Sequence, residues 1–156
     1  METDETIKKG FLRLERYAQN IPGGFHCCAE DPENGYPFAY VSDRFLEILG
    51  WEREEFAARF DNRYTALIHP DDLAAGLRYR NAENSATYAK NGDSIFRILG
   101  KNGYRWVTNA ANQVEWYGKG YIVGTITDIT PYMELREKLE QQSRTQREAL
   151  ETANHN

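Results

Sequence analysis

The chain has 156 residues, a mass of 18.1 kDa and a formal net charge of −5, with 40% hydrophobic and 28% charged residues. This length and balance are typical of one soluble globular domain and exclude a disordered or fibrous protein. The negative charge argues against a nucleic-acid-binding protein. No apolar run approaches the roughly 20 residues of a membrane span, and the acidic first five residues are unlike a secretory signal.

Residues 1–20 are predicted to form an N-terminal amphipathic helix. Its apolar residues recur at alternating four- and three-residue steps, at Ile7, Phe11, Leu14 and Ala18. A proline and two glycines follow and disfavour its continuation. This helix could cover the sheet of its own domain, pair with another protomer, or do both.

Two short strands are predicted over 25–29 and 38–41, joined by a loop rich in turn residues. The first strand holds the two cysteines, Cys27 and Cys28, which are adjacent in the sequence. A disulfide between neighbours is strained, so no disulfide framework is expected, which fits a reducing cytoplasm.

Short helices are predicted after the second strand. The first covers 44–49, with Ser42 or Asp43 as its N-cap and Gly50 as its stop. Another helical stretch covers 52–60. The turn His69-Pro70-Asp71-Asp72 is expected to open a longer helix, with one of its aspartates at the positive N-terminal end.

Strand character returns over 94–99, 104–114 and 121–129, with glycine-containing turns between these segments. The order of two strands, several short helices and three strands predicts an α+β domain with an antiparallel sheet.

The last segment, 131–156, is predicted to be a helix. Its alternating three- and four-residue steps are those of coiled-coil core positions. The residues on this seam are Tyr132, Leu135, Leu139, Gln142, Gln146, Ala149 and Ala153. The seam is apolar only at its start, which suits a linker better than a permanent zipper. We favour a dimeric signalling helix over a charged helix packed on its own domain.

Four short motifs occur in a fixed order. They are Phe38 to Phe45 followed by Leu49-Gly50-Trp51, then Ile68-His69-Pro70-Asp71-Asp72, then Phe96-Arg97 with Gly100 to Val107, and finally Gly124 to Thr130. Each is weak alone, but together, over about 21–130, they resemble the PAS domain family. The resemblance implies a five-stranded antiparallel sheet with short helices on one face and a small internal cavity.

The resemblance also implies a role. Residues 21–130 would form a sensory domain of a bacterial signalling protein, and 131–156 a signalling helix to an output domain in a longer chain. The terminal helices would form a homodimer. The final residues resemble linkers that enter a histidine kinase, so we favour that output. The alternatives are a diguanylate cyclase input, a ligand-free dimerisation or protein–protein interaction module, and a light or redox sensor.

The segment Asp128-Ile129-Thr130 matches a motif that links the last strand to the output helix in related sensors. Its polar side chains can bond exposed backbone donors and fix the exit angle of the helix. A signal relay is therefore expected here, and the alternative is a simple N-cap before Pro131.

No catalytic residue and no metal site are predicted. His26 and Cys28 share one face of a strand, but two ligands do not make a metal site. In flavin photosensors that resemble this family, a cysteine motif that attacks the flavin follows the first helix, and a glutamine stands two residues before the aspartate of the last-strand motif. Flavin is disfavoured here because that cysteine motif is missing and Ile126 stands in place of the glutamine. Haem is disfavoured because 73–88 contains no histidine.

An unidentified small-molecule ligand remains possible for the cavity. The predicted cavity-lining residues are Phe45, Leu49, Phe56, Leu67, Leu73, Leu77, Ala110, Asn112, Ile122 and Ile126. The alternative for all of them is ordinary core. Among the amides Asn109, Asn112 and Gln113, any that points inward could bind a polar ligand. Strand alternation places Asn109 and Asn112 on opposite faces.

Overall fold

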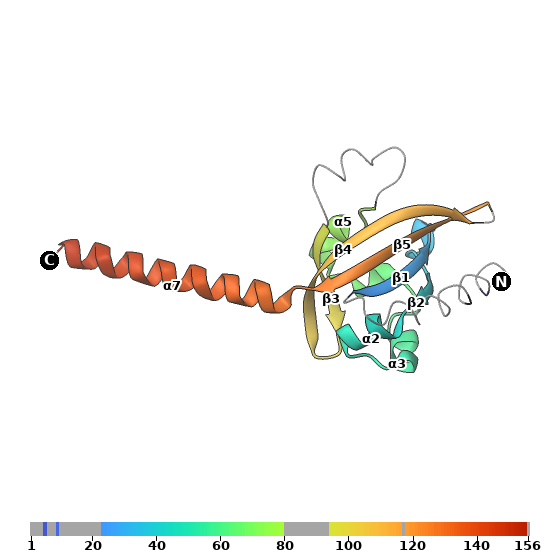
Figure 1. The fold of residues 1–156 in the computed structure, drawn as a ribbon, viewed down its shortest axis with the longest axis horizontal. Helices are drawn as coiled ribbons and strands as arrows, with labels where there is room; N and C mark the ends of the chain where they lie inside the picture. Colours follow the sequence, from blue (N-terminus) through green and yellow to red (C-terminus); the bar gives the residue numbers. More distant parts are fainter. Residues whose placement is uncertain (1–4, 6–8, 10–22, 80–93, 117, 156) are drawn as a thin grey trace.

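The computed structural model describes residues 5, 9, 23–79, 94–116 and 118–155. The predicted helix over 1–20 lies outside these residues, apart from Glu5 and Lys9. Within the described part, one sheet carries a layer of short helices, and a long helix extends away from both (Figure 1).

The sheet has five strands, each antiparallel to its neighbours, in the order β2-β1-β5-β4-β3. They are β1 (Gly24–Ala29), β2 (Phe38–Val41), β3 (Ser94–Gly100), β4 (Gly103–Trp116) and β5 (Lys119–Asp128). The predicted α+β fold with a five-stranded antiparallel sheet is confirmed. The central strand is β5, so the strand that leads into the last helix also pairs with both halves of the sheet.

Between β1 and β3, the described residues form six short helical segments. They are η1 (Pro32–Asn34), α2 (Asp43–Leu49), α3 (Arg53–Arg59), α4 (Tyr64–Leu67), η2 (Pro70–Asp72) and α5 (Leu73–Gly76). The prediction of a longer helix after the His69–Asp72 turn is wrong for the described residues, which continue to Tyr79. The segment forms η2 and then a single turn that ends at Gly76, a residue type that disfavours helix continuation.

Helix α2 begins and ends at the predicted signals. Ser42 is the N-cap, because its Oγ accepts the backbone N–H of Phe45 at 3.2 Å. The same Oγ accepts the N–H of Phe25 at 3.0 Å, which ties β1 to the start of the helix. Gly50 ends α2 with a left-handed φ of 81°, which favours glycine.

The main core lies between the inner face of the sheet and the helices. Its fully buried members include Phe45, Leu67, Phe96, Ile98, Val107 and Ile126. A second buried cluster of Cys27, Ala39, Tyr40 and Tyr121 lies on the opposite face of the sheet.

Both outer strands of the sheet have backbone groups bound by neighbouring segments. On β2, Asn62 donates from Nδ2 to the carbonyl of Phe38, and Arg53 donates to that of Val41. On β3, the carboxylate of Asp72 accepts both the backbone N–H and the guanidinium of Arg97. Asp72 lies at the N-terminus of α5, as expected, but its side chain caps no backbone N–H of that helix and binds the sheet edge.

Helix α7 (Thr130–His155) leaves the end of β5 and projects away from the domain (Figure 1). All side chains from Glu134 to Asn154 are exposed. The alternative in which this helix packs on its own domain is therefore wrong for these residues. Within the described part of the chain, no helix is both long and apolar enough to cross a membrane.

Candidate functional site

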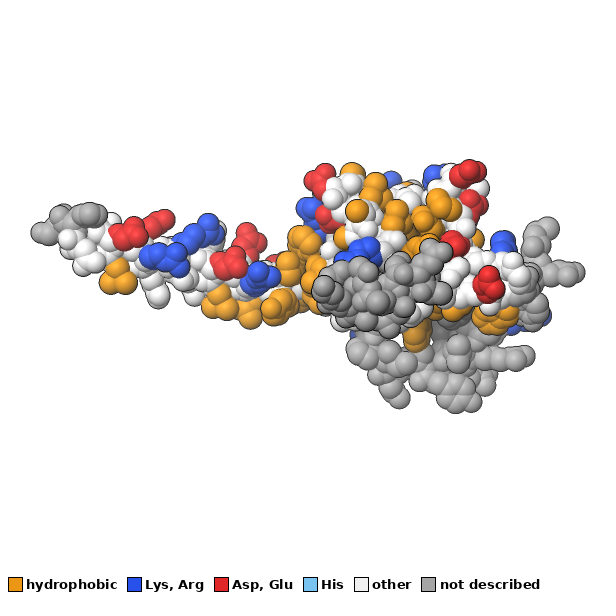
Figure 2. Space-filling model, turned by 90° about the horizontal axis from the view of Figure 1, so that it is seen from above, with side chains coloured by type: hydrophobic (Ala, Val, Ile, Leu, Met, Phe, Trp, Pro, Cys, Tyr) orange, Lys and Arg blue, Asp and Glu red, His pale blue; other side chains and the backbone are white. Residues whose placement is uncertain are grey.

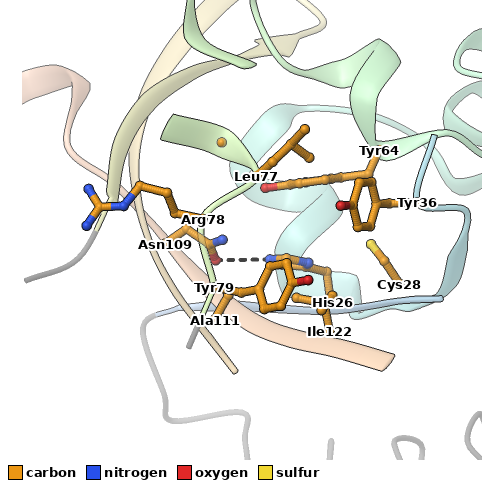
Figure 3. A pocket seen from close by; sticks show the side chains of 11 residues that line it. His26, Cys28, Tyr36, Tyr64, Leu77, Arg78, Tyr79, Asn109, Ala111 and Ile122 are labelled. Carbon is orange, nitrogen blue, oxygen red and sulfur yellow. Dashed lines mark hydrogen bonds between the residues drawn. The ribbon is translucent and has the colours of Figure 1, made fainter. Parts of the chain in front are cut away.

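A small cavity lies between the inner face of the sheet and the segment that follows α5 (Figure 3). The space open to the centre of a water molecule is about 10 Å³, which is room for about one water. The lining residues are His26, Cys28, Tyr36, Tyr64, Gly76, Leu77, Arg78, Tyr79, Asn109, Ala111 and Ile122. Most are aromatic or aliphatic, and His26 and Asn109 form a polar centre among them.

His26 of β1 and Asn109 of β4 are joined by a hydrogen bond across the central strand. The distance from His26 Nε2 to Asn109 Oδ1 is 3.0 Å, and each residue is only 1% exposed. Both side chains reach over Gly124 of β5, which pairs with His26 on one side. A Cβ at Gly124 would lie 2.6 Å from Nε2 and 2.7 Å from Oδ1, so only glycine leaves room for this bond.

The His26 imidazole is uncharged at neutral pH. Burial lowers its pKa to about 4, because the charged form loses its hydration, and the bond to Asn109 opposes this only in part. Since Asn109 presents its carbonyl oxygen, Nε2 carries the proton and donates it. The ring stacks on Tyr64, with centroids 5.3 Å apart and 18° between the planes.

Cys28 lines the same cavity from the same strand. Burial, and to a smaller extent the neighbouring Cys27, raise the pKa of its thiol well above the usual value, so the reactive thiolate is disfavoured. Among the described residues, no group of three or more histidines, cysteines or carboxylates could hold a metal ion.

Of the ten predicted cavity-lining residues, the structure places Leu77 and Ile122 at the cavity. Leu73 is 38% exposed. The five others that are buried belong to the packed core, namely Phe45, Leu49, Phe56, Leu67 and Ile126.

Ala110 and Asn112 do not line the cavity, and both are exposed. The inward residues of β4 are Val107, Asn109 and Ala111, one position out of phase with the predicted set. Asn109 and Asn112 do lie on opposite faces. Sequence reasoning also missed Tyr36 and Tyr64, which come from a loop and a single-turn helix with no periodicity to reveal them.

The junction between β5 and α7 is a second polar site. Asp128 Oδ2 accepts from Nε and a terminal nitrogen of Arg105 at 3.0 and 2.8 Å, and Oδ1 accepts the backbone N–H of Thr130 at 2.9 Å. Thr130 Oγ1 in turn accepts the backbone N–H of Trp106 at 2.8 Å. The first turn of α7 is thus attached to β4 as well as to β5.

The charge on Asp128 is stabilised at this junction. Partial burial alone would raise the pKa of its carboxyl. The hydrogen bonds from Thr130 and Arg105 outweigh that effect, so the pKa lies below the usual value. Thr130 is 6% exposed, which makes its backbone contacts part of the folded interior.

The family described as PAS fold matches residues 38–126, more than half of the chain. The chain belongs to the PAS family. The predicted resemblance is therefore confirmed, and a PAS domain is a sensory module, generally without catalysis of its own. None of the curated proteins searched matches the sequence.

Solved structures of PAS domains share the fold. A sensory box histidine kinase/response regulator from Burkholderia thailandensis E264 is 26% identical over 88% of this chain and 97% of that one, with a TM-score of 0.52. A PAS domain from a two-component sensor histidine kinase is 14% identical over 77% and 96%, with a TM-score of 0.53. An RNA-binding light-oxygen-voltage receptor is 17% identical over 89% and 38%, with a TM-score of 0.56.

Proposed function

We propose that this PAS domain is the sensory input module of a cytoplasmic bacterial signalling protein, with a histidine kinase as its output. Residues 21–130 are the sensor and 131–156 are the signalling helix. The 26% identity to a sensory box histidine kinase over almost the whole of both chains supports this output. The observation that carries the proposal is the polar junction at Asp128 and Thr130.

The junction suits a relay because it couples three elements. Thr130 begins α7, its Oγ1 is bonded to the backbone of β4, and Asp128 ends β5. A movement of β5 relative to β4 must stretch the Arg105–Asp128 pair or the Trp106–Thr130 bond. Either change alters the direction or register of the attached helix.

The exposed apolar start of α7 supports a homodimer. Tyr132, Leu135 and Leu139 are 63%, 55% and 56% exposed, and they lie at the predicted seam positions. Figure 2 shows hydrophobic side chains along this part of the helix, next to the domain. Pairing with the same helix of a second protomer would bury these side chains, as coiled-coil cores do.

Oxidative cross-linking of single-cysteine α7 variants tests the dimer. We expect L139C, on the seam, to form a covalent dimer under mild oxidation, and E137C, on another face of the helix, to form no disulfide cross-link. The native Cys27 and Cys28 are 1% and 2% exposed and should not interfere. Equal cross-linking of both variants would reject the seam.

The relay is tested by adding T130V to the L139C protein. This change removes the hydroxyl that joins α7 to β4, and we expect it to alter the rate of L139C cross-linking at least threefold. Thr145 lies on exposed α7 and bonds only within the helix, so T145V is the matched control. No difference between the two variants would contradict a relay through this junction.

We also infer that flavin and haem are not the resident cofactors. A space of about 10 Å³ is far below the roughly 300 Å³ or more of ordinary cofactor sites. Cys28 reaches the cavity from β1 rather than from a helix, and Ile126 is packed in the core. Visible absorbance of the purified protein would overturn this inference.

The small cavity also favours a second candidate function, a ligand-free dimerisation module. In that case the inner face is ordinary core and the cue acts on the partner helices alone. The two functions differ in whether any small molecule stabilises the domain, which a thermal-shift screen of metabolites on the 156-residue chain would show.

A further inference from the structure

The cavity contains a buried hydrogen-bond acceptor with no partner among the described residues, the Nδ1 atom of His26. Nε2 carries the ring proton and donates it to Asn109 Oδ1. Nδ1 is therefore unprotonated and has a free lone pair. A buried acceptor without a partner is costly, and native structures rarely leave one unpaired. In Figure 3 the edge of the imidazole away from Asn109 faces the pocket.

The residues around this nitrogen also define the charge of an occupant. Among the described residues no carboxylate lines the cavity, and the guanidinium of Arg78 points away from His26 (Figure 3). The other polar groups of the described lining include the phenols of Tyr36, Tyr64 and Tyr79 and the thiol of Cys28. Burial raises the pKa of the Tyr36 phenol and of the Cys28 thiol, so both are neutral at pH 7. An ion would be buried here without a counter-charge from the described lining near His26, which is strongly unfavourable.

We propose that His26 is the ligand-recognising residue of the PAS cavity, and that the cavity takes a small uncharged molecule that donates an N–H or O–H hydrogen bond to Nδ1. This inference rests on the proposed sensory function and gives the chemical class of its cue. The space of about 10 Å³ among the described residues limits the ligand to a compact molecule of few heavy atoms.

Recognition at His26 would act on the strand that leads to α7. The His26–Asn109 bond passes over Gly124, which has no side chain to separate it from the backbone of β5. Gly124 lies four residues before Asp128 in the same strand. A ligand that pulls on the imidazole therefore moves a group in direct contact with β5.

The test uses two probes of nearly equal size, pyrrole and furan, of which only pyrrole has an N–H donor. Leu77 lines the cavity, and L77A makes room for a five-membered ring. We expect this variant of the 156-residue chain to bind pyrrole roughly fivefold to tenfold more tightly than furan, the weight of one hydrogen bond. The double variant L77A/H26L should lose the preference.

A second measurement covers the case in which the double variant does not fold. Nitrogen-15 NMR of the imidazole in L77A should show the Nδ1 resonance of His26 shifting with pyrrole and not with furan. The proposal is overturned by equal affinity for the two probes, by no binding of either to folded L77A, by a preference that survives H26L, or by an unmoved Nδ1 resonance.

These outcomes are separable from those of the proposed function. Loss of the pyrrole preference with normal L139C cross-linking rejects the ligand class and leaves the relay. A clear pyrrole preference without any seam-specific cross-linking rejects the relay and leaves the chemistry of the cavity.

Discussion

The inner face of the sheet and the start of α7 both carry apolar side chains, but they differ in what covers them. On the sheet, Phe96, Ile98 and Ile126 are completely buried under the helical layer. On α7, Leu135 and Leu139 are more than half exposed. The described part of the domain thus covers its own core, whereas the helix leaves a stripe that no described residue covers.

The polar groups of the two regions differ in the same way. The bond between His26 and Asn109 is buried and removed from solvent competition. The ion pair on α7 between Arg136 and Glu140 is exposed on both sides, and such pairs add little stability. The proposed sensing face is therefore held by a buried bond, whereas the described polar contacts of α7 are open to solvent.

The largest effect that would sharpen this contrast is expected from G124A. The added Cβ would fall within 2.7 Å of both polar atoms above β5, and we expect the free energy of unfolding to decrease by about 2–3 kcal/mol. At Gly120 of the same strand, the nearest atom to a new Cβ is 3.4 Å away. G120A should therefore change the free energy of unfolding by about 0.5 kcal/mol or less. Urea unfolding measures both, and equal losses would show that the glycine is not needed for the buried bond.

The next effect is expected from T130V, at the boundary between the two regions. The change preserves the shape but leaves the Trp106 N–H without its acceptor, and it should lower the free energy of unfolding by about 1–2 kcal/mol. T145V, on the exposed helix, should leave it unchanged within about 0.5 kcal/mol. Equal losses in the free energy of unfolding for T130V and T145V would show that the bond between Trp106 and Thr130 adds no stability to the junction.

A smaller and pH-dependent effect is expected from D128N. The folded pKa of Asp128 is lowered, so its charge stabilises the fold above the ordinary pKa of about 3.9, and this contribution is lost as the pH falls through the folded value. At pH 7 the variant should be less stable by about 0.5–1 kcal/mol, because the pair with Arg105 is partly exposed.

This difference should shrink below about pH 4 and disappear once the carboxyl is protonated, which urea midpoints from pH 7 to pH 3 would reveal. The control is D43N, because Asp43 is 75% exposed in its pair with Arg53. A pH-independent difference for D128N would mean that the hydrogen bond to Thr130 acts without the charge.

The smallest effect on folding is expected from L139D. Leu139 is 56% exposed, so the free energy of unfolding of the domain should change by about 0.5 kcal/mol or less. Self-association should nevertheless weaken at least tenfold in sedimentation experiments, whereas Q141D on another face should have little effect. A large loss of domain stability in L139D would break the comparison, since the stripe would then belong to the core.

The fold was predictable because its signals are local. Ser42 and Gly50 mark the two ends of α2, and the turn Gly100 to Gly103 marks a hairpin, so four motifs in order were sufficient. The length of the helix after Asp72 was not predictable from the His69–Asp72 turn alone. The Asp72 carboxylate, which could have capped that helix, is bound by Arg97 at the sheet edge.

The site was predictable only in part, because it depends on pairs that are distant in the sequence. Asn109 and Asn112 have equal local preference for the inward face, and the inward choice depends on the register of β4 with β5. His26 was correctly placed on one face with Cys28. Its bond to a residue 83 positions away could not be read from local pattern.

The covered margins of the sheet limit how two copies of this protein can meet. At β2 the carbonyls of Phe38 and Val41 are bound by Asn62 and Arg53, and at β3 the backbone of Arg97 is bound by Asp72 and by the N–H of His69. Another strand would have to displace these groups before it could add to either margin. Association through side chains can be reversed and shifted without any strand being exchanged, as a reusable switch requires.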